Sequence, residues 1–568
     1  MTRILGVCHD VFICSASIVE DGRVVVAIPE ERLDRVKMSS VFPARAVSAC
    51  LDQAGVSIGD VDEIAVAWNP VIDLETTPSG YLSARRWRVE HLTQVPARFL
   101  GLAGEHAGTT ATITDLWPDA PPITYVDHYF AHLGNAVYLS PYDECAAAVI
   151  DGRAERRTGM LARARGVDVD VLGETDFPHS IGLLYGAVTQ YLGFTPDSDE
   201  WKVMALASYA DADNEFLAPM RDLVHVDERG GFTVALESFA YYNFWDRRMY
   251  SDRFVETFGP PRERGEPITA RHERIAAALQ QAFEETMTAI LVVLHEQTGL
   301  DRLVLTGGCA MNSVFNGKIT ELTPFEECFI TSCPDDSGTS VGAALYLHGV
   351  RSGSRPDASS GHNYWGPSYT DDECRSVAEA FKLPNLTVVD DPSEAAASDL
   401  VAGRLIGWFQ GPMEFGQRAL GNRSILADPR DPEVKDRVNA AVKYRESFRP
   451  FAPAILAEHV EEWFECPAGT RVPFMERVLR FRADRAPEVP AVVHADGTGR
   501  LQSVDSSTSP RFHALIRSFH DKTGVPMVLN TSFNLNGEPI VCSPQDAVRT
   551  FFSCGLDVLY LGNVRVEK

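Results

Sequence analysis

Residues 12–28, FICSASIVEDGRVVVAI, predict a β-hairpin near the start of the chain. Residues 12–19 form an alternating apolar strand, and Asp21-Gly22 is a strong signal for a two-residue turn. Residues 23–28 then return as a second apolar strand, and the charged segment 30–37 leaves the hairpin. A hairpin alone does not choose between sheet folds, so a second signal along the chain is needed.

That second signal lies at residues 303–312. An amphipathic helix with apolar residues at positions 275, 279, 283, 290 and 294 stops at Gly299, and the apolar strand 303–305 follows. This strand enters Thr306-Gly307-Gly308, and the segment runs on to Asn312. A strand, a Gly-Gly turn and a helix start leave backbone N–H groups free for the phosphates or ribose of a nucleotide. There is no GxxxxGK[ST] or GxGxxG motif in this segment. Together with the hairpin, the pattern resembles actin-like domains, the class of sugar kinases and chaperone ATPases.

A change in composition suggests where the first domain ends. Residues 351–362, RSGSRPDASSGH, are the clearest linker, because serine, glycine and proline dominate them. We therefore predict an actin-like domain at residues 1–350 and a second α/β domain at residues 363–568. A chain of 568 residues is too long for one core, which agrees with this division. In the second domain, residues 395–403 predict a helix, and residues 405–409 and 524–529 predict apolar strands.

A basic stretch in the second domain contrasts with the acidity of the chain. The chain has 52 Lys+Arg against 79 Asp+Glu, yet from Arg418 to Arg449 there are eight basic and five acidic residues. Arginine forks and a lysine charge match the oxygens of phosphate or carboxylate, so the stretch predicts a pocket for a small anion. Asn530 and Ser532, which follow an apolar strand, are neutral donors for the same anion. The alternative is a solvated basic face, the usual explanation of a charge run, but apolar neighbours such as Leu420 favour the pocket.

Two histidines lie four residues apart where a predicted strand gives way to a helix. His128 and His132 would share one helix face, and so reach one point in space. Asp151 follows the apolar strand 146–150, and Asp336 precedes Ser337-Gly338, so these carboxylates are candidates to complete a metal site. From the spacing alone, the simpler interpretation is favoured: two partly buried histidines and two turn aspartates.

The overall composition excludes several classes of function. A net charge of −27 argues against a general nucleic-acid or anionic-membrane surface, although one local anion pocket is compatible with it. The 11 cysteines are scattered without a CxxC pair, which suggests a reducing cytoplasm. The first residues lack the pattern of a signal peptide, and no apolar segment has membrane length. We expect a soluble cytoplasmic protein, and a homodimer is compatible with its acidity.

Taken together, the motifs resemble the O-carbamoyltransferases of the nodulation and antibiotic-tailoring type, including the aminoglycoside, cephalosporin and ansamycin or macrolide carbamoyltransferases. The resemblance covers nearly the whole chain, in order, and its C-terminal motifs are the most specific. The segments that carry it are 127–132 (DHYFAH), 149–152 (VIDG), 200–207 (EWKVMALA), 306–312 (TGGCAMN), 417–424 (QRALGNRS), 448–453 (FRPFAP) and 530–534 (NTSFN).

The resemblance implies an ATP-dependent O-carbamoyltransferase that acts in antibiotic tailoring. Its C-terminal half would be of the threonylcarbamoyl-adenylate-synthase type and would make carbamoyl-adenylate from carbamoyl phosphate and ATP, with Mg(II) accompanying the ATP. Its N-terminal half would pass the carbamoyl group to a hydroxyl of a secondary metabolite. Water hydrolyses such mixed anhydrides readily, so fusion of the halves would protect the intermediate. The residues implied for carbamoyl phosphate are Arg418, Lys443, Arg449 and Arg500, with Asn530 and Ser532 at the carbamoyl end.

For the N-terminal half, the resemblance implies a site for Fe(II) or a similar divalent metal. Its ligands would be His128, His132, Asp151 and Asp336. The residues implied near the adenylate are Lys202, Gly307, Gly308, Asn312, Ser337 and Gly338. Lys37 matches a family lysine after the first hairpin and would reach the same site as a catalytic residue, and a solvated charge explains it nearly as well.

One position departs from the family pattern. In relatives, a His-Asp pair stands immediately before the small-residue strand and serves as the base for the acceptor hydroxyl. Here Phe12-Ile13 occupies that place, and His9 lies three residues earlier. A shift of three along a strand turns a side chain to the opposite face unless a bulge intervenes. We assign His9 as the catalytic base on the condition that the chain loops at this point.

Other functions compete with this interpretation. An actin-like small-molecule kinase would need the same hairpin and Gly-Gly turn, but it leaves the arginine-rich half without a role. An ATP-gated binding module of the chaperone kind predicts an apolar peptide groove in the C-terminal half, where anion ligands concentrate instead. A tRNA-modifying threonylcarbamoyl transferase is disfavoured by the acidity of the chain. The sequence does not name the acceptor.

Overall fold

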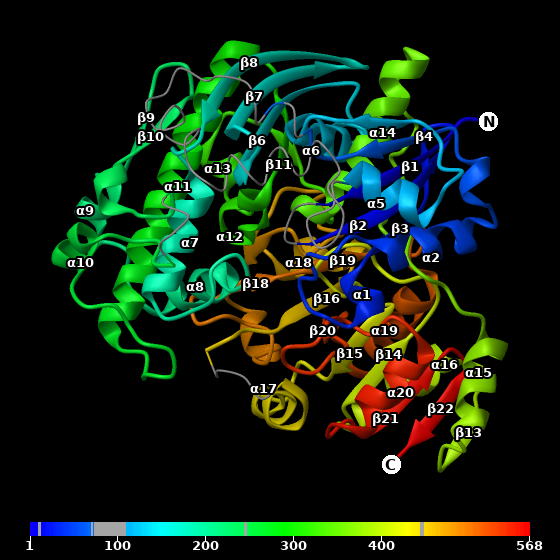
Figure 1. Ribbon diagram of the computed structural model, residues 1–568. Helices are drawn as coiled ribbons and strands as arrows, with labels where there is room; N and C mark the ends of the chain where they lie inside the picture. Colours follow the sequence, from blue (N-terminus) through cyan, green and yellow to red (C-terminus); the bar gives the residue numbers. More distant parts are fainter. Residues whose placement is uncertain (10–12, 70–71, 73–108, 243–246, 444–447) are drawn as a thin grey trace. The chain divides into compact units, whose positions relative to one another are not determined.

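The computed structural model describes residues 1–9, 13–69, 72, 109–242, 247–443 and 448–568, except for the side chain of Lys443 (Figure 1). These residues form two compact units. The N-terminal unit comprises Met1–Glu30, Met38–Asn312 and Lys318–Ser359. The C-terminal unit comprises Glu31–Lys37, Ser313–Gly317 and Ser360–Lys568. Two short segments of the predicted first domain, residues 1–350, therefore belong to the C-terminal unit, and the last change of unit falls within the predicted linker.

The N-terminal unit contains two five-stranded sheets with one topology. The strand order is β3-β2-β1-β4-β5 in the first sheet and β12-β11-β6-β7-β8 in the second. In each sheet three consecutive strands are antiparallel, and two later strands extend the first of them in parallel. This duplication is the arrangement of actin-like folds, so the predicted α/β class and actin-like N-terminal domain are confirmed. The strands are β1 (Arg3–Cys8), β2 (Ser15–Glu20), β3 (Arg23–Pro29), β4 (Glu63–Val66), β5 (Ile123–Tyr125), β6 (Glu144–Ala154), β7 (Arg157–Arg165), β8 (Asp168–Asp176), β11 (Arg302–Thr306) and β12 (Glu327–Phe329).

The predicted hairpin is formed by β2 and β3. Asp21 and Gly22 have φ values of 46° and 79°, the double positive φ of a type I′ turn, which matches the right-handed twist of the strands. The sequence analysis predicted no strand before residue 12, yet β1 lies at the centre of the first sheet. Gly6 interrupts the apolar pattern of β1. No side chain fits at this position, because a Cβ would lie 1.9 Å from Ser340 O. Close contact with a distant segment thus explains the glycine.

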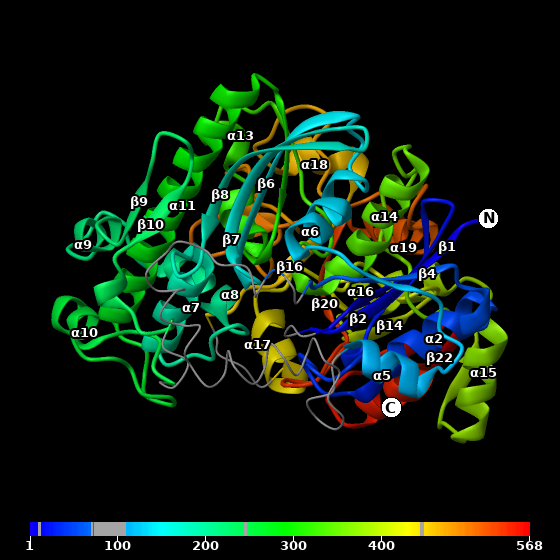
Figure 2. The ribbon, with the colours of Figure 1, turned by 45° about the horizontal axis from the view of Figure 1, so that its top comes forward.

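Two helices lie between the sheets of the N-terminal unit (Figure 2). Helix α14 (Thr339–Ser352) packs on β1 and β2, α6 (His128–Val137) packs on β6 and β11, and the helices pack against each other. Helix α2 (Ala44–Ala54) packs on β2 and β3, whereas α7 (Ile181–Tyr191) and α11 (Ala270–Thr298) pack on β6. Helix α11 is the predicted amphipathic helix, and Gly299 ends it in the left-handed conformation.

Glycines allow α6 and α14 to approach closely. A Cβ on Gly134 would lie 2.2 Å from Gly342 O, and a Cβ on Gly342 would lie 1.8 Å from Ala131 O. Helix α6 carries His128 and His132, and α14 begins three residues after Asp336. The helix contact therefore sets the distance between the histidines and this carboxylate.

Replacing Gly342 with alanine is expected to destabilise the N-terminal unit. The added methyl group would force the helices apart, and overpacking of this kind costs about 1–3 kcal/mol or more of unfolding free energy. Urea unfolding followed by circular dichroism measures the change. Gly59→Ala is the control, because a Cβ there meets only Ser57 Oγ, at 3.8 Å. Equal stability of Gly342→Ala and Gly59→Ala would contradict the close helix contact.

The C-terminal unit is an α/β domain built on one mixed sheet with the order β13-β22-β21-β14-β15-β20-β16-β19. Its apolar core lies between this sheet and its helices, with Trp408 and Tyr560 fully buried. Helix α16 (Pro392–Val401) packs against α19 (Pro510–Thr523), and α15 (Asp371–Ala380) packs against α20 (Pro544–Phe552). The strands are β13 (Leu386–Val388), β14 (Ile406–Phe409), β15 (Arg423–Ala427), β16 (Ala452–Leu456), β19 (Gln502–Val504), β20 (Met527–Ser532), β21 (Val558–Leu561) and β22 (Val564–Glu567).

Among the described residues, no helix combines the length and apolar character needed to cross a bilayer.

Candidate functional site

The histidine pair lies on the first turns of α6. Asp127 is the N-cap of this helix, and its carboxylate accepts the backbone N–H of Tyr129 at 2.9 Å. His128 and His132 follow at i and i+4, and both side chains are fully buried. The predicted change from strand to helix therefore occurs just before His128, which puts both imidazoles on one helix face.

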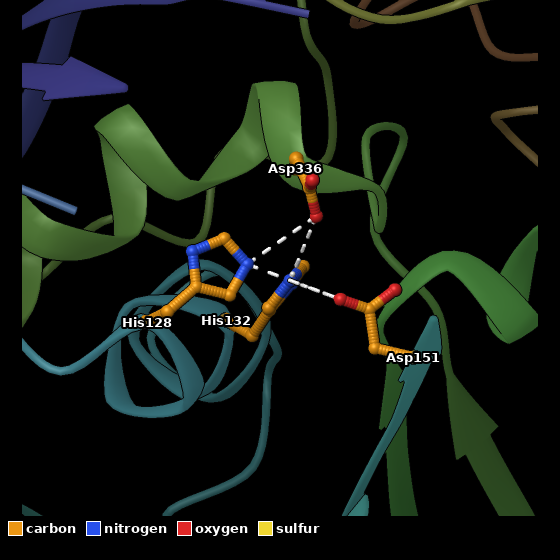
Figure 3. Close-up of side chains that lie close together, drawn as sticks. All are labelled: His128, His132, Asp151 and Asp336. Atoms are coloured by element: carbon orange, nitrogen blue, oxygen red, sulfur yellow. Dashed lines mark hydrogen bonds and ion pairs between the residues drawn. The ribbon is translucent and has the colours of Figure 1, made fainter. Parts of the chain in front are cut away.

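Two aspartates from distant elements meet the histidines (Figure 3). Asp151 lies in β6 just after the regular pairing with β7 ends at Ile150, and Asp336 lies in the short helix before α14. Asp336 Oδ1 is 3.3 Å from His128 Nε2 and 3.4 Å from His132 Nε2. Asp151 Oδ2 is 3.9 Å and 3.5 Å from the same two nitrogens. One ligand atom from each residue lies within 4.8 Å of all the others.

The charges of this cluster are strongly coupled. Burial lowers the pKa of His132, but the carboxylates of Asp151 and Asp336 close to its ring outweigh burial and raise it to about 9. Burial raises the pKa of Asp336, yet His128 and His132 more than offset it, so this pKa falls below its ordinary value. The two carboxylates thus favour a positive charge at the point where the imidazole nitrogens meet.

The four residues fit a divalent metal ion. Ligand atoms about 2.1 Å from one ion lie about 3.0–3.4 Å apart, which is close to the separations of 3.3, 3.4 and 3.5 Å, whereas the 3.9 Å between Asp151 and His128 is longer. Neither ring nitrogen of His132 makes a hydrogen bond to any described residue, although the ring is fully buried. His128 Nδ1 lies 2.9 Å from Ala67 O, and a proton donated there leaves the Nε2 lone pair for a metal. Imidazole and carboxylate together suit iron, zinc and similar ions.

The Gly-Gly turn adjoins this cluster. Gly308 donates its backbone N–H to Asp151 Oδ1 at 2.8 Å. Gly307 has a φ of 90°, and a Cβ on it would lie 2.3 Å from Ile150 O, so the turn requires glycine. One carboxylate therefore joins the predicted metal site to the predicted nucleotide-binding turn.

Asn312 ends the same turn and belongs to a buried polar network. Its amide exchanges two hydrogen bonds with Gln280, at 2.9 and 3.1 Å. Gln280 also donates to Glu284 at 2.9 Å and accepts from the Tyr185 hydroxyl at 3.0 Å, and Lys318 Nζ donates to Glu284 at 2.7 Å. Helix α11 thus holds Asn312 in one orientation, a support that the sequence did not indicate.

The other residues predicted near the adenylate, Ser337, Gly338 and Lys202, differ in their burial and in their contacts. Ser337 is fully buried and donates to Asp335 at 2.6 Å, and a Cβ on Gly338 would lie 2.1 Å from Cys333 O. Lys202 forms an ion pair with Asp199 at 3.0 Å and is about one-seventh exposed. Their roles in nucleotide binding stay predictions.

His9 directly follows the last residue of β1, and β2 begins at Ser15, so His9 belongs to neither strand. Positions 10–12 lie outside the described residues, so the condition that the chain loops at this point stays untested. Cys8 Sγ donates to Asp336 O at 3.1 Å, which brings the end of β1 to the metal-ligand segment. His9 Nδ1 lies 3.1 Å from Thr109 Oγ1. Its role as the base stays a prediction.

The structure does not test the roles predicted for Lys37 and Lys443. Lys37 is exposed and belongs to Glu31–Lys37, a segment of the C-terminal unit, and its role stays a prediction. Lys443 ends the π-helix Asn439–Lys443, and its side chain lies outside the described residues.

In the C-terminal unit, three arginine-bearing segments meet near the start of β16. Asn530 pairs with Ala452 across β20 and β16, and Arg449 lies three residues before Ala452. The Asn530 amide also donates to the carbonyl of Ala419, the neighbour of Arg418, at 3.2 Å. It donates to Gln502 Oε1 at 3.1 Å, and Arg500 lies two residues before Gln502. Arg418, Arg449 and Arg500 are all half-buried.

The Ser532 hydroxyl, also predicted to contact the carbamoyl end, donates to Asn534 Oδ1 at 2.7 Å.

Two charged residues in or just before the basic stretch have internal partners. Glu414 Oε1 accepts the backbone N–H groups of Leu420 and Asn422, both at 2.7 Å, and that of Arg423 at 3.1 Å. These turn amides therefore bind a carboxylate of the protein itself. The Arg423 guanidinium is fully buried, donates to backbone carbonyls including Pro367 O at 3.0 Å, and lies 3.7 Å from the centre of the Phe409 ring. Arg423 therefore stabilises the hairpin between β14 and β15.

The sequence analysis missed several residues that orient the site. Glu155, which accepts the backbone N–H of His128, and Gln280 and Gln502 had no readable signal, because each acts through a distant segment. Asp127 could have been found, since an aspartate directly before a predicted helix is a typical N-cap.

Comparison with known proteins gives a consistent result. The family model "Carbamoyltransferase N-terminus" matches residues 3–345, and "Carbamoyltransferase C-terminus" matches residues 397–568. An uncharacterized protein of Synechocystis, sll1178, is 35% identical over 100% of this chain and 97% of its own length. Nodulation protein NolNO of Sinorhizobium fredii is 37% identical over 98% of this chain and 78% of its own length. The 3'-hydroxymethylcephem-O-carbamoyltransferase of Amycolatopsis lactamdurans is 27% identical over 96% of both chains.

Proposed function

This chain belongs to the carbamoyltransferase family, and we propose that it is an ATP-dependent O-carbamoyltransferase that makes carbamoyl-adenylate and then carbamoylates a hydroxyl of a secondary metabolite. One observation supports the proposal most directly. The His128–His132–Asp151–Asp336 cluster and the Gly-Gly turn are joined by the hydrogen bond from Gly308 N to Asp151. An adenylate held at this turn would place its acyl group beside the metal-ligand cluster.

The first half-reaction belongs to the C-terminal unit. Arg418, Lys443, Arg449 and Arg500 would bind the phosphate of carbamoyl phosphate and offset its negative charge. Water releases phosphate from carbamoyl phosphate and leaves carbamate. A carbamate oxygen then attacks the α-phosphorus of ATP, the bond to the β-phosphate breaks, and pyrophosphate leaves with Mg(II). These residues contribute positioning and charge stabilisation.

The second half-reaction belongs to the N-terminal unit. His128, His132, Asp151 and Asp336 would hold Fe(II) or a similar ion, which when bound polarises the carbamoyl carbonyl as a Lewis acid. Gly307, Gly308 and Asn312 would hold the adenylate, with Lys202, Ser337 and Gly338 beside it. The acceptor oxygen forms a bond to the carbamoyl carbon, the bond to AMP breaks, and His9 takes the hydroxyl proton. The cephem O-carbamoyltransferase among the relatives supports a hydroxylated natural product as the acceptor.

The nucleotide products test the proposed function. Incubation of the full chain with ATP, carbamoyl phosphate and a panel of hydroxylated natural products is expected to give AMP, pyrophosphate and a carbamoylated acceptor. ATP hydrolysis without carbamoyl phosphate is the background control. ADP with a phosphorylated acceptor would instead support the small-molecule kinase, and binding of ATP without any product would support the ATP-gated binding module.

A further inference from the structure

A pair of buried amides lies where the arginine-bearing segments of the C-terminal unit meet. Asn530 is 1% exposed and Gln502 is 2% exposed. Asn530 Nδ2 donates to Gln502 Oε1 at 3.1 Å, and Gln502 Nε2 donates to Leu420 O at 2.8 Å. No role was assigned to Gln502 in the two half-reactions. Its side chain nevertheless links the strand after Arg500 to the turn after Arg418.

Backbone carbonyls determine which way both amides point. A carbonyl oxygen only accepts, so the Gln502 atom against Leu420 O must be its NH₂ group. Likewise the Asn530 atom 3.2 Å from Ala419 O must be its NH₂ group. Gln502 Oε1 then faces Asn530 Nδ2, and the two N–H groups of Asn530 both have acceptors. A flipped Asn530 would set its oxygen against two acceptors.

This orientation leaves Asn530 Oδ1 as an acceptor in need of a donor. It is buried and makes no hydrogen bond to any residue that the structure describes. Buried acceptors in native proteins are nearly always satisfied, so an unsatisfied one calls for an explanation. A ligand with an N–H group would supply the missing donor. Among acyl phosphates, the carbamoyl NH₂ is such a group, whereas the methyl group of acetyl phosphate is not.

We propose that Gln502 is a positioning residue: it holds Asn530 so that Oδ1 accepts an N–H of the carbamoyl group, which selects carbamoyl phosphate over acyl phosphates without an amide. The inference rests on the proposed function, because it assumes that carbamoyl phosphate binds here. A site that hydrogen-bonds an N–H group rejects an analogue without it, because its own buried acceptor is then left unpaired.

The affinity ratio of carbamoyl phosphate to acetyl phosphate tests the inference by calorimetric titration of the full chain. Gln502→Met removes the hold on Asn530, and the ratio is expected to fall about tenfold to a hundredfold, the effect of one buried hydrogen bond. The affinity for inorganic phosphate should stay unchanged. Leu420 O keeps the hydrogen bond from the Tyr364 hydroxyl at 2.9 Å, which limits the structural damage. In Gln502→Glu, the neutral acid keeps both contacts, because its O–H donates to Leu420 O and its carbonyl oxygen accepts from Asn530 Nδ2, so at a pH below the pKa of this buried carboxyl the ratio is expected to be kept.

Gln410→Met is the matched control. Gln410 is also 2% exposed and donates to Gly562 O at 2.9 Å, so its loss measures the general effect of removing a buried amide. This control should keep the wild-type ratio. If Gln502→Met does not fold, Asn530→Leu takes its place. It should lose the preference for carbamoyl phosphate over acetyl phosphate, while Gln502→Glu keeps this preference.

The outcomes separate the two proposals. A wild-type protein that does not bind carbamoyl phosphate would overturn the proposed function. A wild type that prefers carbamoyl phosphate, with an unchanged preference in Gln502→Met, would overturn the role of Gln502 alone. A loss of preference in both Gln502→Met and Gln410→Met would show general structural damage and would also overturn a specific role for Gln502.

Discussion

Arg418→Ala is expected to lower carbamoyl-phosphate-dependent AMP formation about 10²–10³-fold, the usual effect of removing one preorganised charge from a transition state. Arg418 adjoins Ala419, whose carbonyl accepts from the Asn530 amide, so its segment lies at the meeting point of the arginines. The loss of a bidentate partner for phosphate should also raise the KM for carbamoyl phosphate. Steady-state kinetics with AMP as the measured product checks both effects.

Arg430→Ala is the matched control for Arg418→Ala. Arg430 belongs to the same basic stretch, but its guanidinium forms an ion pair with Asp428 at 2.6 Å and is about one-third exposed. Its removal should leave the rate within about twofold of wild type, since exposed ion pairs contribute little. An unchanged KM and rate in Arg418→Ala would remove this arginine from the carbamoyl phosphate site.

His132→Ala is expected to abolish metal binding at the cluster of the N-terminal unit. The substitution removes one of four converging ligands and leaves the carboxylates of Asp151 and Asp336 with less positive charge nearby. Loss of a direct ligand should weaken metal affinity by more than the 10–100-fold that loss of a supporting residue costs. Elemental analysis of the purified protein should find iron in the wild type and almost none in the variant.

His272→Ala controls for the loss of a buried histidine. His272 is 7% exposed, and its Nδ1 accepts the backbone N–H of Thr269 at the start of α11, so it has a helix-capping role. This variant should keep its metal even if its stability falls. Full iron retention in His132→Ala would exclude His132 as a ligand.

Much of the fold could be predicted from local signals. The turn at Asp21-Gly22, the stop at Gly299 and the apolar strand before Gly307 each follow from residue types and spacing. The β1 strand was missed because Gly6 weakens its apolar pattern. Glycine is required at this position because the backbone of Ser340, more than three hundred positions away, leaves no room for a side chain. Long-range contact of this kind leaves no periodic trace in the sequence.

The candidate site also combines features that the sequence predicts with features that only the three-dimensional structure shows. The spacing of His128 and His132 indicated a shared face, but only the three-dimensional structure brings Asp151 and Asp336 to it. In the basic stretch, residue type predicted anion binding. Glu414, just before this stretch, instead accepts hydrogen bonds from three of the turn amides, and Arg423 donates to backbone carbonyls. Charge alone did not identify Arg423 as an arginine that supports the fold.

We propose that one chain carries two separable half-reactions, and exchange of labelled pyrophosphate into ATP distinguishes them. With carbamoyl phosphate and no acceptor, the wild type is expected to catalyse this exchange, because carbamoyl-adenylate forms reversibly from carbamate and ATP. His132→Ala should keep the exchange and lose transfer to the acceptor, whereas Arg418→Ala should lose both. Exchange that persists in Arg418→Ala, or that disappears in His132→Ala, would contradict the assignment of the two half-reactions to separate sites.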